Sequence, residues 1–285
     1  ILHFREPAAR PSTDTIAARE YGSLFHRVAE AFFQAHGAAF CERRGTLDEW
    51  QRRVRAIAEE QFESWRAQYP LRGDDSIARE RERLIRQIER LIEIEWEMTA
   101  RTFVAAEWSF GDPAAVPLNL SGDVLYVAGQ VDRVDRWEPA KLSVRDLKTG
   151  RVHDFREEPL NPSRDLQIGL YVLAAEAVLA DQHAAHAAYV HPSAAQEPER
   201  RFEHGDLDAL RESTRAWLTV ARGLLAAGAF PRTPVASDCD YCPFRPSCGP
   251  GAQARSAAQL AAAQLPPELA AFVQLKQPES VDGGR

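Results

Sequence analysis

The sequence predicts an α/β fold with a central mixed β-sheet flanked by helices. The first observation behind this prediction is a change of apolar period along the chain, from helical spacing to strand-like alternation. The second is that helical and strand-like segments then alternate, an order typical of layered α/β folds. The third is that 45% of the 285 residues are hydrophobic, which suffices for a substantial buried core.

Helical periodicity comes first along the chain. A helix is predicted from about Thr13 to a stop near Gly37, and two long helices follow at residues 47–70 and 75–102. Both are highly charged, and Arg and Glu fill most positions outside the apolar stripe of the second, which favours a solvated helical pair over a surface that grips DNA. We expect the pair to form a helical insertion at about residues 45–100.

The apolar period then changes to two, as in strands. Strands are predicted at residues 103–110, 123–137 and 142–147, followed by a helix at 163–182, a strand at 187–190 and a helix at 206–228. A cysteine-rich strap at 236–250 comes next. Residues 1–250 are expected to form one domain, and residues 251–285 a tail that is partly helical and disordered at its end.

An acidic hairpin is the most informative segment. If Trp137 pairs with Lys141 across the turn, Asp132 lies directly opposite Asp146, with Cβ atoms about 5 Å apart. Two carboxylates so placed repel each other unless a cation lies between them, and hard divalent cations such as Mg²⁺ prefer oxygen ligands. The metal interpretation therefore requires an odd loop, or a bulge that restores the phase of the two strands.

The chemistry of this hairpin suits phosphodiester hydrolysis, which needs a cation and an activated water. Lys148 shares a strand face with Asp146, where its ammonium can position that water and stabilise developing charge. Arg133 and Asp135 share the face opposite Asp132, where a salt bridge is expected. The alternative is an exposed hairpin with surface ion pairs, because an isolated Asp-x-Lys is common.

Four motifs, taken together and in order, resemble the PD-(D/E)XK nuclease superfamily, specifically its RecB/AddB-like branch. They are Gly-x-x-x-His at residues 22–26, Gly-x-x-Asp-Arg-x-Asp at 129–135, Asp-x-Lys at 146–148 and Gln-x-x-x-Tyr at 167–171. The resemblance spans roughly residues 20–250 and implies a restriction-endonuclease-like fold.

The resemblance also implies a role for each motif residue. His26, Asp132, Asp146 and the carbonyl of Leu147 would hold Mg²⁺ or Mn²⁺, Lys148 would handle the attacking water, and Gln167 and Tyr171 would contact DNA phosphate or support the site. Gln167 and Tyr171 are four residues apart and project from one helix face. Taken alone, a single histidine or such a pair is at least as often structural. Glu107 is expected to add an outer carboxylate.

Three of the four cysteines, Cys239, Cys242 and Cys248, lie within ten residues. Thiolates in such a group select soft metals, either zinc or an iron–sulfur cluster. The resemblance implies a [4Fe–4S] cluster whose fourth ligand precedes the Gly-x-x-x-His motif, where this chain has no cysteine. Either that ligand lies before Ile1, in a longer parent chain, or Cys41 substitutes for it. We favour the first, with Cys41 as a packed apolar residue.

The expected function is a metal-dependent DNA nuclease, most specifically a single-strand exonuclease. By resemblance it would be the nuclease domain of a helicase–nuclease that processes double-strand breaks, with single-stranded DNA and a helicase domain or subunit as partners. A standalone exonuclease, a DNA-binding clamp that has lost catalysis and a purely structural interaction domain are the alternatives. The intact Asp146 and Lys148 argue against the clamp.

Charge and hydropathy add two expectations. The net charge of −7 argues against a passive nucleic-acid coat, although a carboxylate-rich metal site is compatible with it. No apolar run approaches the ~20 residues that span a bilayer, and there is no signal segment, so the expected location is cytoplasmic.

Overall fold

The computed structural model describes residues 13–98, 101–120, 122–150, 160, 165–194, 197–239, 242, 244–261 and 264–276. Its helices are α1 (Ala18–Cys41), α2 (Leu47–Arg66), α3 (Asp74–Glu97), α4 (Leu166–Val178), α5 (Gly205–Ala226), the 3₁₀ helix η1 (Ala236–Cys239), α6 (Arg245–Cys248), α7 (Ala252–Leu260) and α8 (Pro267–Lys276). Its strands are β1 (Thr102–Phe110), β2 (Val116–Leu120), β3 (Asp123–Val127), β4 (Gly129–Glu138), β5 (Lys141–Leu147), β6 (His183–Val190) and β7 (Glu199–Glu203).

The central sheet has five strands in the order β1-β4-β5-β6-β7. The pair β5 and β6 is parallel and its chain crosses over through α4, whereas the other three pairs are antiparallel. Strands β2 and β3 form a separate two-stranded ribbon. The predicted mixed sheet flanked by helices is therefore confirmed.

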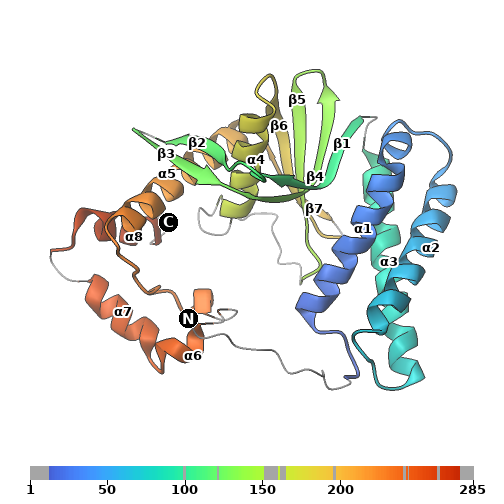
Figure 1. Ribbon diagram of the computed structural model, residues 1–285, viewed down its shortest axis with the longest axis horizontal. Coiled ribbons are helices and arrows are strands. Elements are labelled where there is room, and N and C mark those ends of the chain that lie inside the picture. The colour runs from blue at the N-terminus through green and yellow to red at the C-terminus, as the bar shows by residue number, and fades with distance from the viewer. Residues whose placement is uncertain are drawn as a thin grey trace, which may run out of the picture.

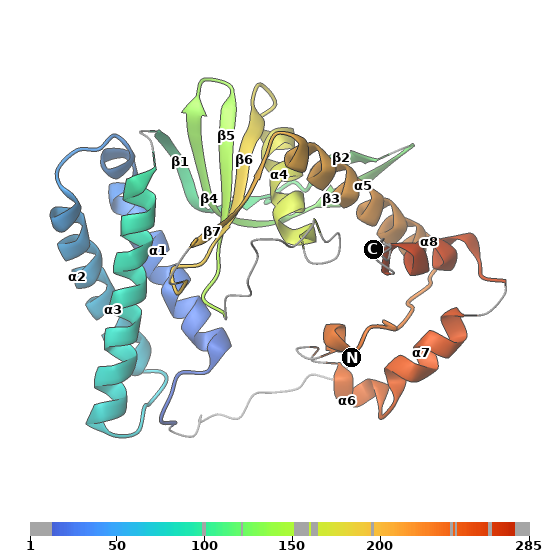
Figure 2. The same cartoon turned by 180° about the vertical axis from the view of Figure 1, so that it is seen from behind.

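Helices cover both faces of the sheet, as Figures 1 and 2 show from opposite sides. One apolar core joins α1, α2 and α3 to sheet residues such as Leu147 and Val190. The other joins α4, α5 and the β2–β3 ribbon to the opposite face, including Val134 and Val144. One face of β4 and β5 therefore packs on α1, α2 and α3, and the other packs on α4, α5 and the ribbon. The site described below lies on these two strands.

The helix α1 extends past its predicted end at Gly37 and reaches Cys41. A Cβ atom at Gly37 would lie 2.8 Å from the Phe103 ring of β1. The glycine therefore permits close packing of the helix on the sheet and does not mark a stop. The predicted ends of the second and third helices are also too late, since α2 and α3 finish at Arg66 and Glu97.

The sequence prediction misses two strands, β2 and β7. It also joins two strands into one at residues 123–137. The segment 123–137 divides into β3 and β4, because β3 leaves the main sheet to pair with the unpredicted β2. Strand β7 escapes prediction because charged residues occupy four of its five positions. One of these, Arg200, is nevertheless buried, because it pairs with the buried Asp165.

The register of the acidic hairpin agrees with the prediction, although its turn does not. The pairs run from Arg133↔Arg145 to Arg136↔Leu142, and the same register continued by one residue sets Asp132 against Asp146. The turn itself closes at Glu138↔Lys141, and a bulge between positions 136 and 138 compensates for the changed loop length. This is the phase-restoring bulge that the metal interpretation allows.

The segment after the strap contains two described helices, α7 and α8. The helix α8 packs on α5, where Phe272 is buried against Trp217 with ring centroids 6.5 Å apart. Lys276 also forms an ion pair with Asp238 of η1 at 2.6 Å. The disorder predicted at the end of the tail, residues 278–285, lies outside the described residues, and so do residues 1–12. Among the described helices, none combines the length and apolar character needed to cross a membrane.

Candidate active site

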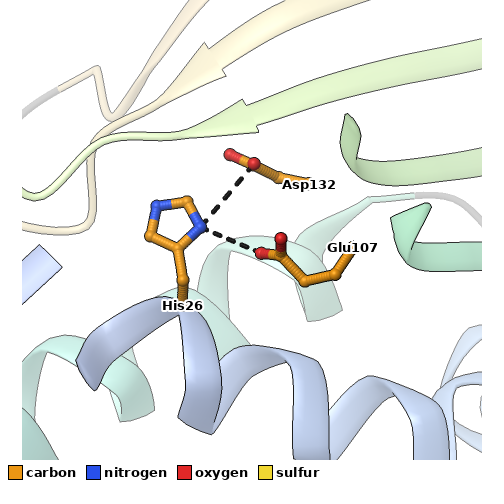
Figure 3. A group of neighbouring side chains, drawn as sticks. All are labelled: His26, Glu107 and Asp132. Atoms are coloured by element: carbon orange, nitrogen blue, oxygen red, sulfur yellow. Dashed lines mark hydrogen bonds and ion pairs between the residues drawn. The ribbon is translucent and has the colours of Figure 1, made fainter. Parts of the chain in front are cut away.

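His26 is the point at which α1 meets the sheet. The apolar face of α1 is buried, and His26 lies at its margin, half-buried, beneath β1, β4 and β5 (Figure 3). Its Nδ1 lies 3.0 Å from Glu107 Oε1 and 3.6 Å from Asp132 Oδ1, and its Nε2 lies 3.1 Å from the Leu147 carbonyl oxygen. All three partners are oxygens that can accept, so the protonated imidazole satisfies both contacts when no cation is bound, whereas a neutral imidazole frees one ring nitrogen to act as a ligand.

Glu107 owes its position to an unusual backbone conformation. Its φ of +47° lies in the left-handed region, which is strained for a residue with a side chain. The neighbouring pairs are Ala106↔Arg133 and Trp108↔Val131, so Glu107 stands across from Asp132 on the adjacent strand. The structure thus places this carboxylate directly against His26, closer than the outer position expected from the sequence.

Asp132 lies where β4 and β5 separate. The paired residues of the two strands end at Arg133↔Arg145, and Asp132 Oδ2 accepts a hydrogen bond of 2.6 Å from the Leu147 backbone N–H. The Leu147 N–H thus has a carboxylate as its acceptor where the backbone pairing of β4 and β5 has ended. The other oxygen of Asp132, Oδ1, is left to face His26.

A chain of polar contacts links the end of β5 to α4. Lys148 Nζ lies 2.6 Å from Asp146 Oδ2 and donates a hydrogen bond of 2.8 Å to Gln167 Oε1. Gln167 Nε2 in turn donates to the Tyr171 hydroxyl at 2.8 Å. Asp146 Oδ2 is buried, and its contact with Lys148 has the distance of an ion pair but not hydrogen-bond geometry. The structure therefore joins Gln167 and Tyr171 to the Asp-x-Lys motif.

The protonation equilibria show that negative charge is crowded here. Burial, followed by the charge of Asp146, raises the pKa of Asp132 to about 7. Burial also raises the pKa of Asp146, despite the nearby Lys148. Burial alone would lower the pKa of His26, but its hydrogen bond to Glu107 and the charge of Asp132 raise it to about 8. Burial raises the pKa of Tyr171 to about 12.

The donor set fits a hard divalent cation. One ligand atom each from His26, Glu107 and Asp132 lie within 4.8 Å of one another, and among the described residues no other His, Cys, Asp and Glu side chains converge in this way. Asp146, with its buried oxygen, is close enough to shift the pKa of Asp132. Carboxylates whose pKa values are raised by burial and by neighbouring negative charge are those that a bound cation would stabilise in their charged form.

Behind this site, the opposite face of the same strands holds a buried arginine cluster. Arg133 and Arg101 both contact Asp135, at 3.1 Å and 2.9 Å, which confirms the expected Arg133–Asp135 salt bridge. Arg145 lies 2.6 Å from Glu95 of α3, and Arg101 contacts the same carboxylate. All five side chains are buried.

The cysteine strap is described only in part. Cys239, Cys242 and Cys248 are half-buried free thiols, and the Cys242 N–H donates to the Cys239 carbonyl at 3.4 Å. Cys41 is buried elsewhere, with its Sγ 3.0 Å from an Arg133 nitrogen, and α1 and α6 lie on opposite sides of the molecule in both views. Burial raises the pKa of the Cys41 thiol to about 11. Cys41 is thus a core residue, and the metal of the other three stays a prediction.

The comparison with protein families supports the fold. The family model of the PD-(D/E)XK nuclease superfamily matches residues 1–249, and the chain belongs to this superfamily of metal-dependent nucleases. A search of the curated proteins gave no match.

Proposed function

We propose that the chain hydrolyses DNA phosphodiester bonds in a reaction that depends on Mg²⁺ or Mn²⁺. The observation that carries this proposal is the convergence of His26, Glu107 and Asp132 beside the Asp146–Lys148 pair. In the proposed site His26 in its neutral form, Glu107, Asp132, Asp146 and the Leu147 carbonyl would hold the cation. When bound, the cation supplies Lewis acidity toward the phosphate and lowers the pKa of water.

The remaining residues would position the reactants. The Lys148 ammonium is oriented by Asp146 and Gln167, so it can hold the attacking water and stabilise charge that develops on the phosphate. The Tyr171 hydroxyl accepts from Gln167, which leaves its own proton to donate to a phosphate oxygen. Its raised pKa keeps this hydroxyl protonated at neutral pH.

The proposal extends to the substrate and to the setting. The order of the four motifs supports a single-strand exonuclease that works with a helicase domain or subunit in the processing of double-strand breaks. The sequence spacing of Cys239, Cys242 and Cys248 supports a [4Fe–4S] cluster, with zinc as the alternative. Iron and sulfide analysis of the purified protein separates the two. A cytoplasmic location belongs to the same proposal.

The test is degradation of end-labelled single-stranded DNA with Mg²⁺ or Mn²⁺ by the wild-type chain and by Lys148→Ala. Lys141→Ala is a matched control, because Lys141 makes only a surface ion pair with Glu138 near the hairpin turn. We expect cleavage that EDTA abolishes, that K148A lowers by about a thousandfold and that K141A leaves unchanged. Equal loss in both lysine variants would assign the effect to folding or to general charge.

The inactive clamp makes the opposite prediction. It would bind single-stranded DNA without cleaving it, with or without metal, and K148A would change nothing but affinity. Such a result from folded protein that retains its cysteine-bound metal would reject the proposed enzyme.

A further inference from the structure

Three residues form a row across the sheet beside the candidate active site. Asp146 of β5 is the register partner of Tyr189 in β6, and Tyr189 is the partner of Arg200 in β7. Register partners on adjacent strands point to the same face, so the three side chains share the face that packs on α4. Neither Tyr189 nor Arg200 belongs to the motifs of the sequence analysis.

Tyr189 lies beneath the Lys148 ammonium. Lys148 Nζ is 5.4 Å from the centroid of the Tyr189 ring, within the range of a cation–π interaction. The ring is almost fully buried, and the Ile168 backbone N–H in the first turn of α4 is close enough to its hydroxyl to favour the ionised form. One tyrosine therefore contacts both the ammonium and the helix that supplies Gln167.

The third member of the row fixes the start of that helix. Arg200 donates two hydrogen bonds, of 2.5 Å and 2.9 Å, to the carboxylate of Asp165, the residue that immediately precedes α4. Asp165 is completely buried and Arg200 nearly so. A bidentate pair of this kind fixes orientation as well as distance. Gln167 lies two residues further along α4, and the pair thereby holds its side chain within hydrogen-bonding distance of Lys148.

We infer that Tyr189 and the Asp165–Arg200 pair are positioning residues that hold Lys148 and its partner Gln167 in one geometry. None of the three is a member of the cluster of His26, Glu107 and Asp132, although Tyr189 is the strand partner of the proposed ligand Asp146. The inferred effect passes through the ammonium, and the Mn²⁺ affinity measured below separates it from an effect on metal binding. The inference rests on the proposed role of Lys148 in hydrolysis. Its geometric content, that the Tyr189 ring fixes the Lys148 ammonium, can be tested without any activity.

The geometric test uses the small number of lysines, since the chain has only Lys141, Lys148 and Lys276. Reductive methylation with ¹³C-formaldehyde gives each lysine one dimethyl NMR signal and keeps its charge, and Lys→Arg variants assign the signals. We expect the Lys148 signal to be shifted upfield by the Tyr189 ring and to show an NOE to aromatic protons. Tyr189→Phe should retain the shift, and Tyr189→Met should abolish it.

The kinetic test compares the same variants on single-stranded DNA. Y189M should lower kcat about tenfold with little change in KM or in Mn²⁺ affinity, whereas Y189F stays within about threefold of wild type. Phe62→Leu is the matched control, because it also removes a buried ring, in α2, far from the site. It should lower stability without changing kcat.

The outcomes separate the inference from the proposed function. A Lys148 signal in the wild-type chain with no ring shift and no NOE overturns the inference, whether or not Y189M folds. Loss of kcat in Y189F equal to that in Y189M overturns it as well, since the ring is then not the active element. If the wild-type chain cleaves nothing, the proposed function fails, and the NMR result alone decides the geometry.

Discussion

Strands β4 and β5 carry two charge clusters on their opposite faces. The active-site cluster consists of His26, Glu107, Asp132, Asp146 and Lys148, and the arginine cluster of Glu95, Arg101, Arg133, Asp135 and Arg145. Both draw on adjacent residues of the same hairpin, Asp132 and Arg133 in β4 and Arg145 and Asp146 in β5. The arginine cluster is fully buried, whereas His26 and Lys148 of the active-site cluster stay partly exposed. They differ in charge balance. In one, three arginines face Glu95 and Asp135, and Arg145 also pairs with Glu199, so that each carboxylate has an arginine partner. In the other, three carboxylates surround one histidine and one lysine.

The pKa values express this difference. Burial alone would raise the pKa of Glu95, but the charges of Arg145, Arg133 and Arg101 outweigh it and hold it at about 2. Burial and Asp146 raise the pKa of Asp132 to about 7. Burial disfavours the charged carboxylate in both places, so the neighbours decide the sign. In this protein the raised pKa falls at the candidate cation site and the lowered pKa falls within a buried ion-pair cluster.

The largest expected effect comes from two identical substitutions in β4. Asp132→Asn should lower metal-dependent cleavage by about a thousandfold while the protein stays folded, because it removes a cation ligand and relieves repulsion. Asp135→Asn should lower the free energy of unfolding by about 3 kcal/mol, because it leaves buried arginine charge uncompensated. Nuclease assays and urea unfolding measure the two effects.

These two variants can also contradict the distinction between the active-site cluster and the arginine cluster. If D132N unfolds the protein as much as D135N does, the active-site carboxylates also hold the fold together. The distinction between the two faces of the hairpin would then be lost.

The next expected effect is a loss of folding stability when the arginine cluster is changed at α3. Glu95→Gln keeps the shape of the side chain but removes the charge shared by Arg101 and Arg145, and should cost about 3 kcal/mol of stability. Glu93→Gln, two residues earlier in α3, removes a partly exposed partner of Arg90 and should cost less than about 1 kcal/mol. Equal costs in thermal unfolding would show that the buried cluster contributes no more than a surface pair.

Sequence reasoning is sufficient for those parts of the site that depend on local geometry. Strand alternation and the turn determine which residues of the hairpin face each other, so the sequence alone predicts that Asp132, Asp146 and Lys148 share one face. The helical spacing of Gln167 and Tyr171 works in the same way, and the structure joins them to Lys148. The metal and DNA-binding roles of these residues stay predictions.

Other features depend on contacts between distant segments, which a single sequence does not reveal. The direct contact of Glu107 with His26 requires a left-handed backbone conformation that no pattern in β1 indicates. Arg200 lies in a segment too charged to resemble a strand, and only its buried partner Asp165 explains it. The predicted helix stop at Gly37 is wrong because the ring that packs on this glycine, Phe103, belongs to a strand far along the chain.

The smallest expected effect is a difference in the pH dependence of stability, measured by urea unfolding in EDTA. The folded pKa of Asp132 lies above the ordinary 3.8, so its contribution to stability is complete below about pH 4 and is lost as the pH rises through about 7. The folded pKa of Glu95 lies below the ordinary 4.5, so its contribution is present above that pH and is lost as the pH falls toward 2. D132N should therefore flatten the stability curve between pH 4 and 7, and E95Q should flatten it between pH 2 and 4.5. Saturating Mg²⁺ should also flatten the curve between pH 4 and 7, because a bound cation stabilises the ionised carboxylate. If neither D132N nor Mg²⁺ alters the slope between pH 4 and 7, the crowded negative charge lies elsewhere in the molecule.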